Sequence, residues 1–441
     1  MKKDEATLRE IMYPTTEAKN GLQAVKPPTP THDELRDRFI DEHADYAYGL
    51  GEWRRYEDGI WPTTPEMKVK QDMCQVIEAA KPEGIKPTNS LLTSVTELTR
   101  VKVAVQDTEW DAETDMLVCQ NGALRISTRE LQPHRREHHA TSAVPYRYDP
   151  KAIPVMWRDF LKNIVPEAAP FLQEFAGYTL TTDVSYEMAL WLFGPPGSGK
   201  STFLAGLQAM LGHRAGLLGL AEVERNRFAL AGLPGKTLVA ASEQPSSYLA
   251  STNVLNAIIS GEPLQIERKY HDPVTVLPRC KIAWAMNELP RVADANSGLF
   301  RRVKVVRFPQ LPAEGRDPKV KKAIEEEGAG ILNWALEGLA RLEARGHFEV
   351  PERVEDATEQ FRTNNDVPAL FVADRCIIDE PDAKEKASAL YSEYRVWCED
   401  NGHRPQSSTR LADDWQRLGF ERKRIKGSTY YQGVRLRLPS A

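Results

Sequence analysis

The middle of the chain carries four short runs in which nearly every residue is apolar. They span residues 190–193, 237–241, 281–286 and 303–308. Runs of this length without polar alternation are typical of strands buried on both faces of a parallel sheet. Stretches with apolar residues at helical spacing lie between them. The pattern therefore predicts an α/β fold, with helices on the faces of a mostly parallel sheet.

The segments on either side predict further helices and hairpins. Apolar residues recur at helical spacing over residues 69–80, 157–178 and 331–342, which predicts helices there. Asp58-Gly59 and Asn121-Gly122 each lie between runs that favour strands. Both pairs are typical of the turn in a two-residue β-hairpin.

The last part of the chain is basic, although the whole protein carries a formal net charge of −5. Residues 404–441 contain nine Lys or Arg and three Asp or Glu, which gives this segment a net charge of +6. Helical patterns over 387–398 and 408–418 precede a hairpin pattern around Gly427-Ser428. This order indicates a winged helix-turn-helix, and a small solvated packing domain is the alternative. The basic residues of the predicted wing, which we expect to bind DNA, are Arg422, Lys423, Arg424 and Lys426.

A chain of 441 residues is too long for one ordinary core and predicts several domains. Its polar, proline-containing start indicates a flexible arm. The predicted division is an arm over residues 1–33, a small N-terminal α+β domain over 34–150, the nucleotide-binding core over 151–315, a helical segment and linker over 316–380, and the winged-helix domain over 381–441.

Composition excludes several other classes of protein. No apolar run approaches the length that spans a bilayer, and the start of the chain does not resemble a secretion signal. We therefore expect a cytoplasmic protein without membrane contact. The five cysteines form no CxxC pair, which argues against a disulfide framework or a zinc ribbon. They are Cys74, Cys119, Cys280, Cys376 and Cys398.

A phosphate-loop motif follows the first predicted strand. The residues Gly194, Pro195, Pro196, Gly197, Ser198, Gly199, Lys200, Ser201 and Thr202 fit the pattern GxxxxGK[ST]. The glycines let backbone N–H groups come close to a triphosphate, and the next helix directs the positive end of its dipole at the same place. The motif predicts ATP and Mg²⁺ as cofactors, with Lys200 at the β- and γ-phosphates and the Ser201 hydroxyl on the metal.

Polar residues end the next two predicted strands. Glu243 ends the second, where a carboxylate can hold Mg²⁺ through water and act as the base for the attacking water. Two acids in a row are usual at this place, and here Ser242 occupies the first position. Asn287 ends the third strand and is a candidate sensor of the γ-phosphate. The alternatives are a surface glutamate and an asparagine that forms a turn.

Arg301 and Arg302 directly precede the fourth predicted strand. A guanidinium at this place can reach the nucleotide of a neighbouring subunit and stabilise the charge on the transferring phosphoryl group. The sequence leaves open which of the two would do so, and a solvated arginine pair is the alternative.

A short basic segment lies between the second and third predicted strands. Arg268, Lys269 and His271 cluster beside Tyr270, and Gly261 and Pro263 punctuate the residues before them. Such a hairpin can grip a phosphodiester backbone and offer a stacking face to a base. A solvated turn is the alternative.

Taken in order, these motifs resemble a known family. The segments GPPGSGKST, TLVAASEQP, SGEPLQIERKYHDP, AWAMNELPRV and LFRRVKVVRFP are similar to the superfamily 3 helicase part of phage and plasmid primase-helicases, which are related to the poxvirus primase-helicase. The resemblance continues through GILNWALEGLARL, includes the segment around Cys119-Gln120-Asn121-Gly122, and covers residues 40–440. As an ordered set the motifs are specific, whereas singly only the phosphate loop is.

The resemblance implies an AAA+-like core that assembles as a hexameric ring with ATP bound between subunits. Lys200, Ser201 and Thr202 would then belong to Walker A, Glu243 to Walker B, and Asn287 to sensor 1. Arg301 or Arg302 would be the arginine finger, and Arg268, Lys269 and His271 would lie on a pore hairpin that tracks single-stranded DNA from 3′ to 5′. Asp41 and Asp45 lie in a helical run rather than at strand spacing, so no primase activity is expected here.

The sequence thus predicts an ATP-dependent DNA helicase for the replication of a phage, prophage or mobile element in a bacterial host cell. Its expected partners are single-stranded and forked DNA and further copies of itself, and a separate primase or replication initiator is a candidate partner. Two other classes stay open: a phosphate-loop kinase of a small molecule, and a non-unwinding AAA+ origin-binding protein or helicase loader.

Overall fold

The computed structural model describes residues 28–226, 228–244, 248–267, 273–293, 298–312, 318–380 and 382–437. The chain divides into two compact units. The first comprises residues 1–46 and 64–104, and the second comprises residues 47–63 and 105–441. Each unit is described by itself.

The first unit is helical in its described part. Its helices are α2 (His32–Glu42), α3 (Glu66–Ala79) and α4 (Asn89–Lys102), with a short 3₁₀ turn, η1 (Lys81–Glu83). The Thr31 side chain accepts a hydrogen bond from the N–H of Glu34 and begins α2 with a capping box. Phe39 of α2 and Met73 of α3 are fully buried. The helix predicted over residues 69–80 is confirmed as α3, which begins three residues earlier.

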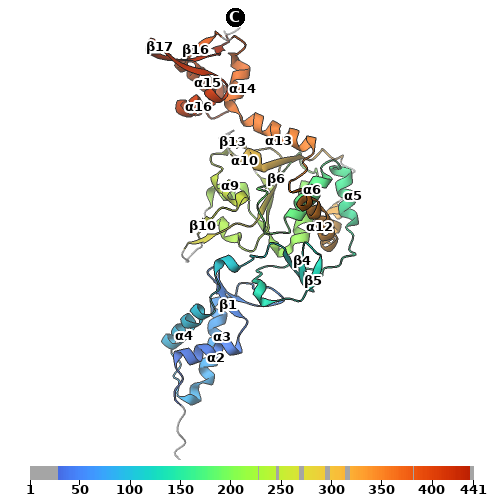
Figure 1. Ribbon diagram of the computed structural model, residues 1–441, viewed down its shortest axis with the longest axis vertical. Coiled ribbons are helices and arrows are strands. Elements are labelled where there is room, and N and C mark those ends of the chain that lie inside the picture. Colours follow the sequence, from blue (N-terminus) through green and yellow to red (C-terminus); the bar gives the residue numbers. More distant parts are fainter. Residues whose placement is uncertain are drawn as a thin grey trace, which may run out of the picture. The chain divides into compact units, whose positions relative to one another are not determined.

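A five-stranded sheet forms the centre of the second unit (Figure 1). Its strands follow the order β14-β6-β12-β8-β7, and every neighbouring pair is parallel. The bounds are β6 (Ala189–Phe193), β7 (Ala215–Leu217), β8 (Leu238–Gln244), β12 (Lys281–Met286) and β14 (Val303–Arg307). The α/β fold and the four predicted strands are confirmed. The sequence pattern missed β7, because this edge strand has only three residues and none of them is buried.

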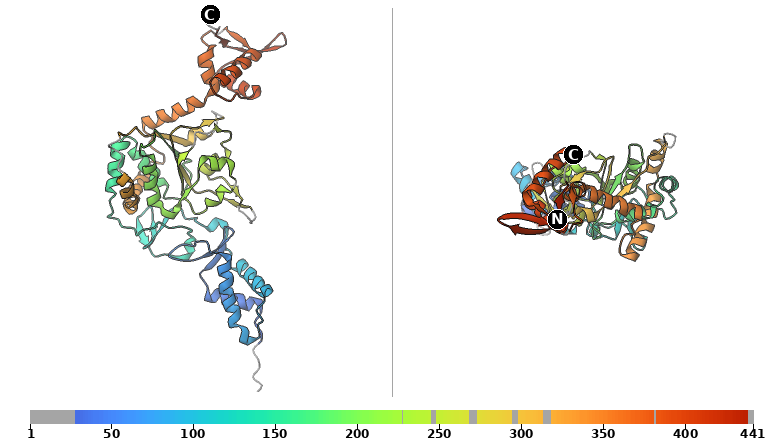
Figure 2. Two further views of the ribbon diagram at one scale, coloured as in Figure 1. Left: turned by 180° about the vertical axis from the view of Figure 1, so that it is seen from behind. Right: turned by 90° about the horizontal axis from the view of Figure 1, so that it is seen from above.

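Helices cover both faces of this sheet (Figure 2). Side chains alternate along each strand, so Leu190 and Leu192 face one layer whereas Ala189 and Trp191 face the other. This double burial explains the unbroken apolar runs. One layer contains α5 (Val155–Ile164), α6 (Ala169–Tyr178), α7 (Lys200–Leu211), α11 (Pro318–Glu325) and α12 (Gly328–Arg345), and the other contains α8 (Leu220–Arg225), α9 (Asn253–Ser260), α10 (Leu299–Arg302) and α13 (Glu352–Asn365).

The helix predicted over residues 157–178 is two helices rather than one. Helix α5 ends at Ile164 and α6 begins at Ala169. Pro166 lies between them, and proline has no N–H with which to continue a helix. The helix predicted over residues 331–342 is confirmed as part of α12.

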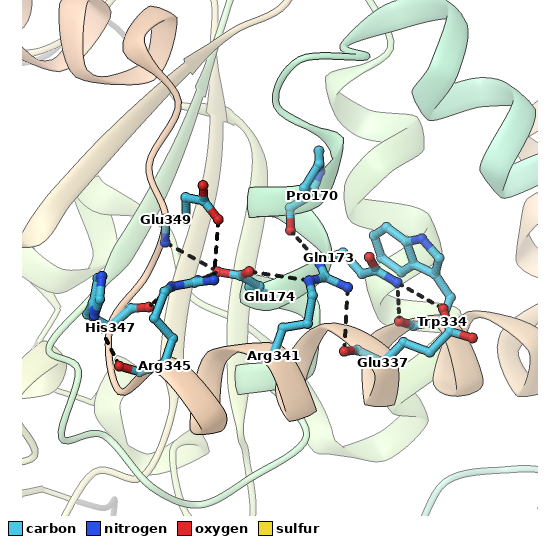
Figure 3. Close-up of polar contacts among 9 residues, drawn as sticks. All are labelled: Pro170, Gln173, Glu174, Trp334, Glu337, Arg341, Arg345, His347 and Glu349. Atoms are coloured by element: carbon cyan, nitrogen blue, oxygen red, sulfur yellow. Dashed lines mark hydrogen bonds and ion pairs between the residues drawn. The ribbon is translucent and has the colours of Figure 1, made fainter.

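Helices α6 and α12 cross closely and share a polar network (Figure 3). A Cβ on Gly338 would lie 2.3 Å from the carbonyl oxygen of Gln173, so only glycine permits this approach. Glu174 is 2 % exposed in its side chain and forms an ion pair with Arg345 over 2.5 Å, with Arg341 3.6 Å away. Gln173 donates to the carbonyl oxygen of Trp334 over 2.7 Å. These contacts fix α12 to the layer that supports the phosphate loop.

Short strands and turns complete the second unit before the sheet. They are β1 (Tyr46–Gly49), β2 (Glu52–Arg55), η2 (Asp107–Glu109), β3 (Met116–Cys119), β4 (Gly122–Arg125), β5 (Glu130–Gln132) and η3 (Arg136–His138). Both predicted hairpins are present. Asp58 and Gly59 have φ values of 48° and 90°, and Glu57 pairs with Ile60 across that turn. In the second hairpin Cys119 pairs with Gly122, so the turn is one residue earlier than predicted.

The remaining short elements are η4 (Gly212–Arg214), η5 (Ala229–Gly232), β9 (Tyr248–Leu249), β10 (Leu264–Ile266), β11 (Val274–Val276) and β13 (Arg291–Val292). None of the helices among the described residues has the length and hydropathy that crossing a bilayer requires. All five cysteines are free, and only Cys74 is exposed.

The C-terminal part has a core of its own around Phe371, Tyr394 and Trp415. The predicted helices are confirmed as α15 (Ala387–Asp400) and α16 (Ser408–Arg417). The predicted hairpin is confirmed as β17 (Glu421–Ile425) and β18 (Ser428–Gln432), to which β16 (Lys384–Lys386) adds a third strand that the sequence did not indicate. The other elements are α14 (Val367–Arg375), β15 (Cys376–Ile377) and β19 (Arg435–Leu436).

Candidate nucleotide-binding site

The phosphate-loop motif forms a tight turn between the end of β6 and the start of α7. Gly194, Gly197 and Gly199 have φ values of 158°, 75° and 93°. A Cβ on Gly194 would lie 2.3 Å from the carbonyl oxygen of Phe308, so the loop can leave the sheet beside β14 only with glycine at this place. Helix α7 begins at Lys200, so its N-terminus faces the loop.

The loop presents backbone donors without protein acceptors. Within the described part of the chain, no residue accepts a hydrogen bond from the N–H groups of Gly197, Ser198 or Gly199. Pro195 and Pro196 have no N–H to contribute. Three unused amides beside a helix N-terminus form a donor set that suits phosphate oxygens.

Lys200 is folded back onto the same loop. Its Nζ donates to the carbonyl oxygens of Gly194 and Pro195 over 2.6 and 2.9 Å, and lies 3.1 Å from the Ser198 hydroxyl. The residue is only 6 % exposed, and burial lowers the pKa of its ammonium group. Because its hydrogen-bond partners among the described residues are all neutral oxygens, phosphate oxygens would be stronger partners for this charge.

Asn287 completes the surroundings of Lys200. It directly follows β12, whose Met286 pairs with Phe193 at the end of β6. The Asn287 Oδ1 accepts a hydrogen bond from Lys200 Nζ over 3.1 Å. The parallel register thus brings together two residues that the sequence selected independently, 87 positions apart.

The two predicted metal-binding residues lie at the same edge of the sheet. Ser201 is exposed in the first turn of α7. The backbone of Glu243 lies near the end of β8, where Gln244 pairs with Met286 of β12. The side chain of Glu243 falls outside the described residues, so its part in a metal site stays a prediction.

Arg301 and Arg302 lie at the opposite edge of the sheet. Helix α10 ends where β14 begins, and Val303 pairs with Ala189 at the start of β6. A five-residue strand is about 16 Å long. The structure therefore does not bring these arginines to the phosphate loop of their own chain.

The two arginines differ in their surroundings. Arg302 is 8 % exposed, and its Nε donates to Glu187 over 2.8 Å. Arg301 is exposed, and no hydrogen bond or ion pair joins it to another described residue. One side chain is thus positioned within the chain and the other is available at its surface.

The predicted DNA contacts belong to two segments, of which the structure describes only one in full. Strands β10 and β11 pair antiparallel, from Leu264 with Val276 to Ile266 with Val274. The residues Arg268, Lys269, Tyr270 and His271 between them lie outside the described residues. In the second hairpin every residue of β17 is exposed, and Lys426 has a φ of 46° in the turn that leads to β18. This places Arg422, Lys423 and Arg424 on a solvent-facing strand.

Arg307 is a candidate that the sequence reasoning missed. It ends β14, and its guanidinium carbon lies 5.5 Å from the centre of the Phe193 ring. A cavity of about 380 Å³ beside the loop is lined by both residues, together with Asn287 and Gln360. The available signal was the one that selected Asn287: a polar residue that ends an apolar strand.

Comparisons with known proteins cover most of the chain. Residues 33–166 match a family described as D5 N terminal like, and residues 192–302 match a family of unknown function, DUF5906. A protein of Acanthamoeba polyphaga mimivirus, named "Putative helicase L207/L206", is 22% identical over 272 residues, which are 55% of this chain. This chain spans only 28% of the length of that relative.

Solved structures agree with the fold. Two apo structures of the NrS-1 C-terminal region align with a TM-score of 0.50 at 12% identity. The alignments cover 90% and 91% of this chain and 97% and 98% of those chains. The chain is thus similar to a viral putative helicase over about half of its length, and it shares the fold of the NrS-1 C-terminal region.

Proposed function

We propose that the protein is an ATP-dependent DNA helicase of superfamily 3, which moves from 3′ to 5′ on single-stranded DNA as a homohexameric ring. In this proposal it unwinds DNA for the replication of a phage, prophage or mobile element in a bacterial host cell. The observation that carries the proposal is the contact of Lys200 with Asn287 beside the unused amides of the loop. Together they form a site for a terminal phosphate and a residue that can sense it.

In this proposal the roles follow from position. The N–H groups of residues 197–199 and the ammonium of Lys200 would hold the phosphates, and Ser201 and Glu243 would hold Mg²⁺, which when bound would neutralise charge on the phosphoryl group. Asn287 exchanges its contact with Lys200 for the γ-phosphate or the attacking water. Glu243 accepts the proton of that water.

The place of Arg301 and Arg302 supports shared nucleotide sites. They lie about 16 Å, the length of one short strand, from the edge that carries the loop. An arginine that takes part in hydrolysis would therefore have to serve the nucleotide of a neighbouring subunit. The ion pair of Arg302 with Glu187 would hold that side chain ready, whereas Arg301 is exposed and has no hydrogen-bond or ion-pair partner among the described residues.

Two hairpins supply the contacts with DNA in this proposal. The hairpin of β10 and β11 would follow the strand through the ring, and the basic β17 would hold duplex DNA at the fork. The sequence motifs resemble those of primase-helicases, so a separate primase or initiator is the further partner to test.

Strand displacement on a forked duplex tests the proposal. Wild-type protein should unwind the fork only with ATP and Mg²⁺, and single-stranded DNA should stimulate its ATP hydrolysis. Lys200→Ala should lose both activities, whereas Lys269→Ala should keep basal hydrolysis and lose unwinding. Lys162→Ala, an exposed lysine on α5, is the matched control. A Lys269→Ala protein that unwinds normally would show that the hairpin does not move DNA.

A non-unwinding origin-binding protein is the second candidate, and the exposed basic face of β17 favours it. Such a protein would prefer one DNA sequence, and that preference would survive Lys200→Ala. Binding of random and origin-derived duplexes by the wild type and this variant separates the two functions.

A further inference from the structure

A second cavity lies at the other edge of the central sheet. Its volume is about 110 Å³, and all of its lining residues belong to the second unit. Arg214, Thr237 and Thr182 line it where β7, β8 and the loop after α6 begin. Val276 and Leu277, which follow the hairpin of β10 and β11, form another wall. This site is separate from the phosphate loop, which lies at the ends of the same parallel strands.

Arg214 is a buried cation that forms no ion pair with another described residue, although the charge of Asp111 acts on it and raises its pKa against the effect of burial. Its residue exposure is 5 %, and its Nη2 donates to the carbonyl oxygen of Leu180 over 2.9 Å. Its Nε is buried and has no hydrogen-bond partner. Asp111 also lines the cavity, but its carboxylate accepts from the N–H and hydroxyl of Thr141, and no ion pair joins it to Arg214 among the described residues.

Lys281 is a second buried cation close behind Arg214. It is 2 % exposed, its Nζ donates to the carbonyl oxygen of Thr181 over 2.7 Å, and it lies 4.3 Å from the centre of the Tyr178 ring. No described carboxylate pairs with it. Burial lowers its pKa to about 7, although the charge of Asp183 raises the pKa, and the charge of Arg214 lowers it further. Two basic groups without an ion pair among the described residues are costly to charge in one buried region, and a bound anion would favour the charged form of both.

Two hydroxyl groups at the cavity have unused hydrogen-bonding capacity. The Oγ1 atoms of Thr182 and Thr237 are both buried without a partner. Thr237 is held beside Arg214, because its backbone N–H donates to the Arg214 carbonyl oxygen over 2.9 Å. Buried hydroxyls normally find a partner, so three unsatisfied polar side chains at one cavity indicate a missing acceptor.

We propose that this cavity binds a small oxyanion, a carboxylate or a phosphate group, through Arg214 and the hydroxyls of Thr182 and Thr237. The rest of its lining combines apolar side chains such as Trp110, Met116 and Leu233 with charged residues of both signs, which are Asp107, Asp111, Glu113, Lys236 and Arg279. The apolar part would suit a short apolar body attached to the anionic group. The bound anion would join the segment around β3, the start of the sheet and the strand that leaves the β10–β11 hairpin. The proposal concerns a site away from the phosphate loop and does not depend on the proposed function.

Thermal unfolding of the full chain tests the site, with inorganic phosphate and acetate as probes against chloride at constant ionic strength. The melting temperature of the wild type should rise saturably with either probe, because a ligand that binds only the folded state stabilises it. The double variant Thr182→Val and Thr237→Val should fold, since valine has a similar shape and each hydroxyl lacks a partner. It should lose most of the rise, as should Arg214→Met. Thr128→Val, at an exposed threonine outside the cavity, should keep the rise in full.

Three results would overturn the proposal. A rise that Lys200→Ala removes and the cavity variants keep would place the anion in the phosphate loop. A rise that all variants keep, or one that never saturates, would reflect a general salt effect. No rise beyond that with chloride would mean that the cavity holds only water.

Discussion

The central sheet has one buried lysine at the edge where its parallel strands end and another at the edge where they begin. The first lies in a site that the sequence reveals, whereas the second lies in a region that the sequence does not mark. At the edge where strands end, Lys200 has four oxygen partners, supplied by the glycine loop and Asn287. At the edge where strands begin, Lys281 has the carbonyl and hydroxyl oxygens of Thr181 and the ring of Tyr178, with Arg214 nearby. The first cation is held by a local motif, and the second by residues that only the fold brings together.

The largest expected effect is at the edge with the loop. Lys200→Ala should reduce ATP hydrolysis to background, because no other described cation lies on the loop between β6 and α7. The melting temperature without nucleotide should change little, since Lys200 is held only by hydrogen bonds to backbone carbonyls and to two side-chain oxygens. Measured turnover would contradict the assignment of the loop if it stayed within about 10-fold of the wild type.

Variants of Arg301 and Arg302 test whether an arginine of one subunit acts on the nucleotide that a neighbouring subunit binds. Loss of the acting arginine should lower turnover by about 10³-fold, so Arg301→Ala and Arg302→Ala together identify which one acts. A mixture of that variant with Lys200→Ala should regain part of the activity, because some interfaces then combine an intact loop with an intact arginine. No regain in a mixture that assembles would show that each chain works alone.

Glu187→Gln should weaken hydrolysis only if Arg302 is the acting residue, since it releases only that side chain.

Replacing Asn287 should lower ATP turnover less than replacing Lys200 or the acting arginine. Asn287→Ala removes a neutral hydrogen bond, so turnover should fall about 10²-fold with ATP binding largely kept. Asn287→Asp should instead weaken ATP binding, because a carboxylate would pair with Lys200 and repel the γ-phosphate. Asn163→Ala, at an exposed position of α5, is the control. Equal turnover in Asn287→Ala and the wild type would make Asn287 a simple turn residue.

The sequence predicted the edge with the loop well because its signals are local. A glycine pattern, an apolar strand before it and a helix after it are all contained in residues 189–211. Asn287 could be selected because it ends an apolar run, but its contact with Lys200 needed the strand order β6-β12. The edge with Arg214 and Lys281 gave no signal, because Thr182, Arg214, Thr237 and Lys281 are single residues far apart in the chain. Their burial depends on packing that no periodicity records, as does the short edge strand β7.

The smallest expected effect, and the one specific to the hidden edge, is a pH dependence of stability from Lys281. Its pKa is about 7 in the folded protein, against 10.5 for an unperturbed lysine. Between these values the unfolded chain binds the additional proton, so the free energy of unfolding should rise with pH, by at most about 1.4 kcal/mol per pH unit. Below about 7 both states are protonated, and this contribution to the slope ends.

Lys281→Met should remove this contribution, because methionine fills a similar volume without charge, and the variant should be more stable than the wild type near neutral pH. Urea unfolding of both proteins between pH 7 and 10 measures the difference in slope, and Lys162→Met controls for the loss of an exposed lysine. Saturating phosphate should shrink the wild-type slope, since an anion near Lys281 favours its charged form. Equal slopes in wild type and Lys281→Met would show that Lys281 keeps its proton in the folded chain, with the charge of Asp183, which raises the pKa of Lys281, outweighing burial.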